Sequence, residues 1–367
     1  MKRYRRLTCM LLLIFAVFLC LPCAVLADEN EAEIDVPVPE ILLDYLPAET
    51  GDFSPAEVLK TFDFGFFTKI GIRMIADSAP DAARSFALLL GLMLMAAVLG
   101  IFRRTVTAQG LQTVMELASM VCIASAVFAV TETAFALSES YISSLSSFMR
   151  RITPTMSAFM IASGQMTSAA VITGVIFTAV TLLETIVASV LFPMIRLSLC
   201  LSVVTTLFGV TGISGIAPMV KKMISYVFGF VALCLSAVLM FQGIIAKSAD
   251  SLALRGIKFA VGQFVPFVGG AVNEALATLI GGVGKIKAAT GVVGAVIVCL
   301  LAAMPVIRIL LHKLFMELVS VCAGILGLSS ESRLMSEVAS FLGYMAATTA
   351  ISSVFFVLSL SIMASLG

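Results

Sequence analysis

The chain of 367 residues has no Trp, a single His and few charged side chains. Charged residues make up 12% of it, against roughly 25% in soluble domains, while hydrophobic residues make up 60%. This composition excludes a soluble globular domain. With a net charge of +1 there is no basic surface for phosphates, so we expect no nucleic-acid partner. The mean hydropathy of +1.11 predicts an integral membrane protein surrounded by the lipid bilayer.

Sequence signals for catalysis and for metal or cofactor binding are also absent. His312 has no second histidine at ligand spacing and no nearby Ser or Cys nucleophile, so we expect it at a helix end. The eight Cys include no CxxC pair, and no disulfide framework is predicted. No GxxxxGK[ST] phosphate loop occurs, so the chain is not expected to hydrolyse a nucleotide. We expect no enzymatic activity, no metal and no cofactor.

The N-terminus has the features of a secretion signal. Basic residues precede an apolar run at 11–21, and small residues at 25–27 suit a cleavage site. We therefore predict a signal peptide at 1–27, cleaved after Ala27. An uncleaved signal anchor is the alternative.

Residues 28–80 are predicted to lie outside the cytoplasm. Acidic residues and Pro are frequent between 28 and 57, where no Lys or Arg occurs. Such a composition is typical of a partly disordered segment that follows a signal peptide. Between 55 and 79 a cluster of Phe alternates with charged residues, which predicts an amphipathic helix on the membrane surface or against the bundle.

The rest of the chain contains eight stretches apolar enough to cross a bilayer, judged against the ~20 residues that a helix needs. We therefore predict an all-α, polytopic bundle of about eight transmembrane helices. Two of these helices, at 84–137, precede the remaining six. The stretches are 84–102, 114–137, 168–192, 194–217, 223–246, 288–304, 306–328 and 338–366.

Prolines indicate an internal repeat with an offset of 112 residues. Pro154 and Pro193 recur at this offset as Pro266 and Pro305, and Gly positions recur with them. Proline interrupts helical hydrogen bonding and Gly permits close approach, so shared positions predict a shared backbone path with helix breaks at all four prolines. Chance similarity between apolar sequences is the alternative.

The two repeats, at 144–250 and 256–366, each begin with a less hydrophobic stretch. These stretches, 144–165 and 261–283, are rich in small and polar residues and are predicted to be short re-entrant or interfacial segments. Three spans after such a segment give the repeats opposite orientations, as in many transporters. If the short segments cross the membrane fully, the repeats are parallel.

Ionisable residues within spans are candidates for a polar pathway or for structural pairs, because inserting a charge into a bilayer costs roughly 2.5–3.5 kcal/mol. Glu132 and Glu184 lie in the second and third predicted spans. Asn273 and Glu274 follow the Gly-rich stretch around Pro266. The alternative for the carboxylates is a water-filled vestibule or pairing with neighbouring hydroxyl groups.

Two arginines, Arg196 and Arg308, are related by the repeat, and each follows a proline by three residues. Such an arginine can bind a lipid headgroup, a carboxylate on another helix or an anionic solute. The alternative is that each side chain extends to the membrane surface without binding anything specific.

Three motifs in the second half of the chain resemble a known family. They are AKSADSLALR (246–255), FVPFVGG (264–270) and KAATG (287–291), and they resemble the stage III sporulation protein AE family. The resemblance implies a multi-pass protein made in the mother cell of an endospore-forming bacterium, in the membrane around the forespore. It also implies a place in a channel or secretion apparatus that links the two cells.

The partners that the resemblance implies are other stage III A sporulation proteins, including a separate ATPase and ring-forming components, and stage II sporulation protein Q. The family supplies no catalytic residues. Two functions are compatible with the sequence. One is a channel- or transporter-like subunit, and the other is a non-conducting membrane scaffold that recruits the ring and the ATPase.

Overall fold

The computed structural model describes residues 64–105, 109–208, 216, 219–238, 240 and 269–365. The predicted signal peptide, the acidic segment and Pro266 lie outside these residues. All regular elements within the described part are helical, which confirms the all-α prediction. They are α3 (Phe64–Thr105), α4 (Gln109–Ala162), α5 (Met166–Ile186), the π-helical turn η3 (Val187–Leu191), α6 (Phe192–Phe208), a helix at Met219–Val238, α8 (Gly269–Ile325) and α9 (Ser329–Ser365).

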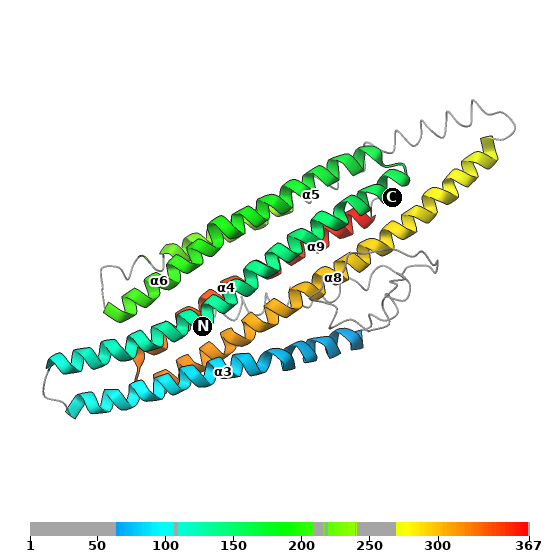
Figure 1. Cartoon of the computed structure of the whole chain (residues 1–367). Coiled ribbons are helices and arrows are strands. Elements are labelled where there is room, and N and C mark those ends of the chain that lie inside the picture. Colours follow the sequence, from blue (N-terminus) through cyan, green and yellow to red (C-terminus); the bar gives the residue numbers. More distant parts are fainter. Residues whose placement is uncertain are drawn as a thin grey trace.

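The helices run alongside one another in an elongated antiparallel bundle, and α6 continues the line of α5 (Figure 1). Two glycines with positive φ make the tight reversals. Gly164 (φ 85°) joins α4 to α5, and Gly327 (φ 78°) joins α8 to α9. In each reversal the following residue donates its N–H to a carbonyl five positions back, Gln165 to Met160 at 2.8 Å being one case. This is the Schellman arrangement, which satisfies the last carbonyls of a helix.

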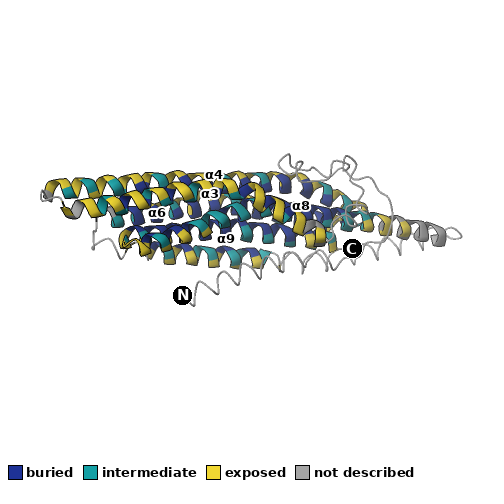
Figure 2. Ribbon diagram, turned by 90° about the horizontal axis from the view of Figure 1, so that it is seen from below, coloured by how far each residue is buried: buried dark blue, intermediate teal, exposed yellow. Residues whose placement is uncertain are grey.

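The core is formed around α8 and α9, which pack on each other more extensively than any other pair of described elements. The most apolar stretches of these two helices are each 61% buried, whereas that of α3 is 17% buried. Figure 2 shows the same contrast between buried and exposed helices. Close approach requires glycine, because a Cβ added at Gly291 would lie 2.4 Å from the Cβ of Ala364 on α9.

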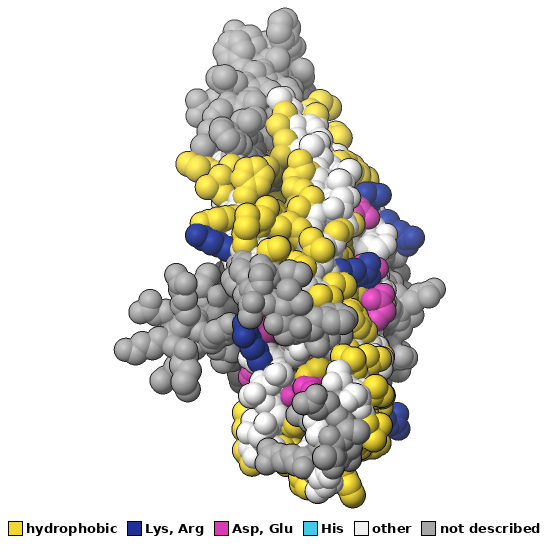
Figure 3. Space-filling model, turned by 90° about the vertical axis from the view of Figure 1, so that its left-hand side faces the viewer, with side chains coloured by type: hydrophobic (Ala, Val, Ile, Leu, Met, Phe, Trp, Pro, Cys, Tyr) yellow, Lys and Arg dark blue, Asp and Glu magenta, His cyan; other side chains and the backbone are white. Residues whose placement is uncertain are grey.

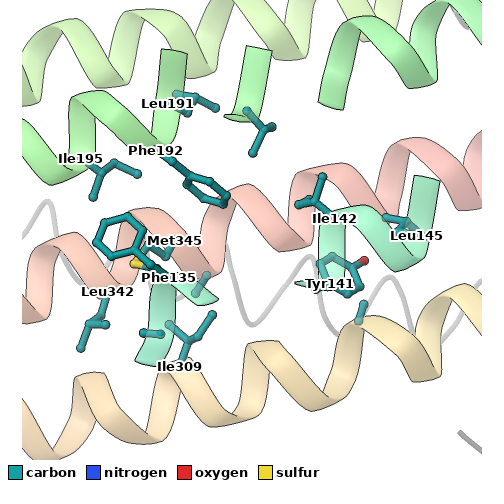
Figure 4. Close-up of a cluster of buried hydrophobic side chains, with 14 of the residues drawn as sticks. Phe135, Tyr141, Ile142, Leu145, Leu191, Phe192, Ile195, Ile309, Leu342 and Met345 are labelled. Atoms are coloured by element: carbon teal, nitrogen blue, oxygen red, sulfur yellow. The ribbon is translucent and has the colours of Figure 1, made fainter. Parts of the chain in front are cut away.

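Aromatic and aliphatic side chains fill the middle of the bundle (Figure 4). Phe135 of α4 meets Phe192 of α6 edge-on, with ring centroids 6.0 Å apart and planes at 89°. Ile309 of α8 and Met345 of α9 belong to the same buried cluster. Phe135 thus anchors the part of α4 that carries the candidate site described below.

Six helices in the described residues, rather than the predicted eight, are long and apolar enough to cross a membrane. The difference arises because two pairs of predicted spans, 168–192 with 194–217 and 288–304 with 306–328, each form one continuous helical stretch, Met166–Thr206 and Gly281–Ile325. In addition, α4 and α8 continue through Pro154 and Pro305 without ending. Within a membrane bundle, neighbouring groups satisfy the backbone group that proline leaves free, so the helix is tolerated. The predicted helix breaks at these two residues are therefore wrong.

The short segment predicted at 144–165 is also wrong as a separate element, because residues 144–162 form the end of α4. Likewise, residues 269–283 are the first part of α8, and the described end of the amphipathic stretch is the first part of α3. The proposed repeat is not confirmed. Pro193 follows the π-helical turn, whereas the repeat-related Pro305 lies within an uninterrupted helix.

The bundle is longer than a bilayer is thick. With 54 residues, α4 is about 81 Å long, against about 30 Å for the hydrocarbon core. Large apolar side chains are exposed from Leu88 to Phe102 on α3 and from Leu111 to Phe128 on α4, near the end where these helices meet. Viewed from this end, apolar side chains cover much of the described surface (Figure 3). This end presents the surface best suited to lipid contact.

Candidate functional site

Ion pairs connect α4 to the neighbouring α5 and α6. Arg150 Nη2 donates a hydrogen bond of 2.8 Å to Glu184 Oε2. The reversal at Gly164 makes α4 and α5 antiparallel, which brings these two positions to the same level. The side chains are half-exposed, at 48% for Arg150 and 34% for Glu184.

Further along, Arg196 of α6 binds two carboxylates of α4. Its Nη2 lies 3.2 Å from Glu139 Oε1 and 3.4 Å from Glu132 Oε1. The two acids are seven residues apart, which places them on one face of a helix with 3.6 residues per turn. The guanidinium carbon also lies 4.7 Å from the centroid of the Phe135 ring, a cation–π contact.

The π-helical turn Val187–Leu191 explains why Glu184 and Arg196 both face α4. An α-helix turns by about 100° per residue, so twelve residues would leave these positions about 120° apart. One extra residue in a π-helical turn reduces the difference to about 20°. The turn therefore aligns the two charged positions on one side.

We call these five residues, Glu132, Glu139, Arg150, Glu184 and Arg196, the α4 seam. Three carboxylates and two guanidinium groups leave one negative charge in excess. Glu132 is the most exposed of them, at 69%, and makes the longer of the two contacts with Arg196. The excess charge is therefore available to a cation or to a basic side chain of another protein.

A separate ion pair joins the helix Met219–Val238 to α9. Lys221 binds Glu337, and the Lys221 ammonium lies 5.0 Å from the centroid of the Phe341 ring. Both side chains of this pair are largely buried, so it serves packing between the two helices.

The structure separates the two arginines that the repeat related to each other. Arg196 pairs with carboxylates, whereas Arg308 donates from Nε to Ser78 Oγ of α3 at 3.4 Å. Asn273 and Glu274 fall in the first turns of α8, where the structure describes the backbone but not the side chains. Their predicted role therefore stays a prediction.

Sequence reasoning singled out Glu132, Glu184 and Arg196 but missed Arg150 and Glu139. The missed residues lie outside the predicted spans, so the free-energy cost of a charge in the bilayer did not single them out. The spacing of Glu132 and Glu139, seven residues apart, was a signal that could have indicated a shared face. Within the described residues, no group of three or more His, Cys, Asp or Glu could hold a metal ion.

The described residues form an all-helical bundle with a charged lateral face and six helices long and apolar enough to cross a membrane, as in polytopic membrane proteins. Residues 63–367 match the family described as stage III sporulation protein AE, and the chain belongs to this family. This confirms the resemblance found in the sequence and makes the chain a sporulation protein. The protein named stage III sporulation protein AE of Bacillus subtilis (strain 168) is similar, with 26% identity over 226 residues.

This alignment covers 62% of the chain but only 57% of the length of the Bacillus subtilis protein. No solved structure matches the chain.

Proposed function

We propose that this chain is a multi-pass membrane subunit of the channel apparatus that links mother cell and forespore during endospore formation. It acts in the membrane around the forespore, beside other stage III A sporulation proteins, a separate ATPase and stage II sporulation protein Q. Family membership supports the sporulation role. The observation that carries the subunit role is the charged seam on the outside of the bundle.

Half-exposed ion pairs are unfavourable against lipid, because charges in hydrocarbon cost several kcal/mol even when partly neutralised. The α4 seam is therefore expected to face water or another protein. The described core of the bundle is built mainly from apolar side chains, so a polar path through one chain is not favoured. We place the polar contact between chains, with Glu132 as the acceptor for a basic residue of the neighbour.

The test is removal of single charges in a sporulating host that carries this chain as its only copy. Glu132→Gln and Glu184→Gln should sharply reduce the number of heat-resistant spores while the protein still accumulates in the membrane. Glu317→Gln removes an exposed carboxylate from α8 and is the matched control, expected to sporulate normally. Normal sporulation of both seam variants would overturn the proposal.

A second candidate function is a non-conducting scaffold that recruits ring and ATPase components. It is favoured by the way Arg150 and Arg196 already bind most of the seam carboxylates within one chain. For a scaffold, Glu184→Gln should leave sporulation unchanged, whereas deletion of residues 28–80 should prevent the other components from assembling at the membrane.

A further inference from the structure

A cavity of about 470 Å³ lies between α3, α4 and α8, away from the α4 seam. One side carries basic groups: Arg84 from α3, and Arg308 and His312 from α8. The opposite side is mainly apolar, with Val130 and Leu137 of α4. A cavity that combines cationic groups with an apolar wall suits an amphiphilic anion.

Arg308 differs from Arg150 and Arg196, the two arginines of the seam. Each seam arginine binds a carboxylate, but Arg308 forms no ion pair with any described carboxylate. Its one hydrogen bond runs from Nε to the neutral Ser78 hydroxyl. Arg308 lines the cavity, and its two terminal nitrogens form no hydrogen bond with any described residue. The residue is half-buried and lies within a predicted span.

His312 lies one helical turn beyond Arg308, well inside α8, so the expectation that it sits at a helix end is wrong. Its Nδ1 lies 2.8 Å from the carbonyl oxygen of Arg308. A carbonyl can only accept, so Nδ1 carries a proton. Nε2 then accepts a hydrogen bond from a protonated phosphate oxygen, and it donates one only when the ring is cationic. Arg84 of α3 has one carboxylate neighbour, Asp81, at 3.7 Å on its own helix.

Two of the three hydroxyl groups at the cavity already donate to backbone carbonyls. Ser85 donates to the Asp81 carbonyl and Thr133 to the Ala129 carbonyl. Asp81 is the single carboxylate among the described residues of the lining, so the two arginines leave this part of the site with a net positive charge. An intramembrane cation without a counter-ion is unfavourable, and an anionic ligand would supply the missing charge.

We propose that this cavity binds a phosphate group, held by Arg308 with support from Arg84 and His312. Guanidinium groups match the geometry of phosphate oxygens and bind them through paired hydrogen bonds. The phosphate can belong to the headgroup of a membrane phospholipid, whose acyl part would contact the apolar wall. Soluble phosphate is the other source of the same chemistry.

Binding to the purified full-length protein in a phosphate-free neutral detergent tests the proposal with three probes. These are dioctanoyl phosphatidylglycerol, inorganic phosphate and dioctanoylglycerol, which has the same acyl chains without phosphate. We expect phosphatidylglycerol to bind and dioctanoylglycerol not to bind. Saturation by inorganic phosphate at similar concentrations would identify a soluble source, and its failure would identify the lipid.

Arginine variants show whether the binding occurs in this cavity. Arg308→Gln and Arg84→Gln should each weaken binding about tenfold, as expected for loss of a charge-assisted hydrogen bond. Arg151→Gln removes the same charge from an exposed position on α4 and should bind like the wild type. Arg84 is exposed on α3, so its variant still tests the site if Arg308→Gln fails to fold.

Three results would overturn the proposal. The first is equal binding of dioctanoylglycerol and phosphatidylglycerol, and the second is no binding of either phosphate probe. The third is unchanged affinity in the Arg84→Gln variant together with unchanged affinity in a folded Arg308→Gln variant.

Discussion

At Arg196, one guanidinium group serves three neighbours at once. It binds Glu132 and Glu139, and it lies over the Phe135 ring, which is itself buried against Phe192. Lysine has a compact ammonium that cannot lie flat on the ring and span both carboxylates. The side chain is 43% exposed, which limits the energy of each contact.

Replacement of Arg196 by Gln should therefore lower the free energy of unfolding by about 1–2 kcal/mol, because two carboxylates lose their partner. Arg196→Lys should recover less than half of the loss. Thermal unfolding in detergent measures both, with Arg151→Gln as the control of equal charge. A melting temperature for Arg196→Gln equal to that of the wild type would show that the contacts do not stabilise the bundle.

Gly291 provides a second test at the level of single residues. An added Cβ would lie 2.4 Å from Ala364 and 3.3 Å from Met156, so Gly291→Ala should force α8 and α9 apart and cost about 1–3 kcal/mol. Gly282→Ala in the same helix meets nothing within 4 Å and should be neutral or stabilise by up to about 1 kcal/mol. Unfolding in denaturant measures the stability of both variants. Equal changes in the free energy of unfolding for Gly291→Ala and Gly282→Ala would contradict the close packing of α8 on α9.

Sequence reasoning at this scale identified some charged residues but not their partners. Glu184 and Arg196 stood out because charge within a span is costly. Their partners depend on the antiparallel register of α4 and α5, which the reversal at Gly164 sets. No local pattern in the sequence relates Arg150 to Glu184, 34 residues away.

Among the elements, the π-helical turn Val187–Leu191 sets the rotation of α6 relative to α5. It corrects the rotation of α6 so that Arg196 faces α4 in line with Glu184. Hydropathy predicted apolar helices on both sides of Pro193, but it contains no information on a single extra residue in a turn. The same limitation explains why Pro154 and Pro305 were wrongly predicted as breaks, since the bundle rather than the local sequence decides whether a helix continues.

Deletion of Ser189 should convert the π-helical turn into ordinary α-helix and shorten the separation of Glu184 and Arg196 from twelve positions to eleven, which keeps them about 20° apart. Arg196 would then retain Glu132 and Glu139, and the protein should melt near the wild-type temperature. In the deletion background, Arg196→Gln should cause a loss of stability as large as in the full chain, which a double-mutant cycle measures. No further loss from Arg196→Gln in that background would contradict the role given to the turn.

On the scale of the whole molecule, the sequence predicted a helical membrane protein and its family. The family and the all-helical fold of the described residues are confirmed, and six of the described helices are long and apolar enough to cross a membrane. The bundle has apolar surface at one end and a charged seam along α4. Its longer helices, α4 among them, exceed the thickness of a bilayer, so a bundle that crosses the membrane upright would project from it. This architecture suits a subunit that contacts lipid at one end and neighbouring proteins through the seam.

Site-specific photo-crosslinking in sporulating cells tests this central claim most directly. A photoreactive phenylalanine at Leu197, which is exposed beside Arg196, should crosslink to an identified sporulation protein or to a second copy of this chain. The same group at Leu318, an exposed apolar position on α8, is the control and should react mainly with lipid. If Leu197 also reacts with lipid alone, the seam does not face another protein, and the account of the chain as a laterally assembled subunit is wrong.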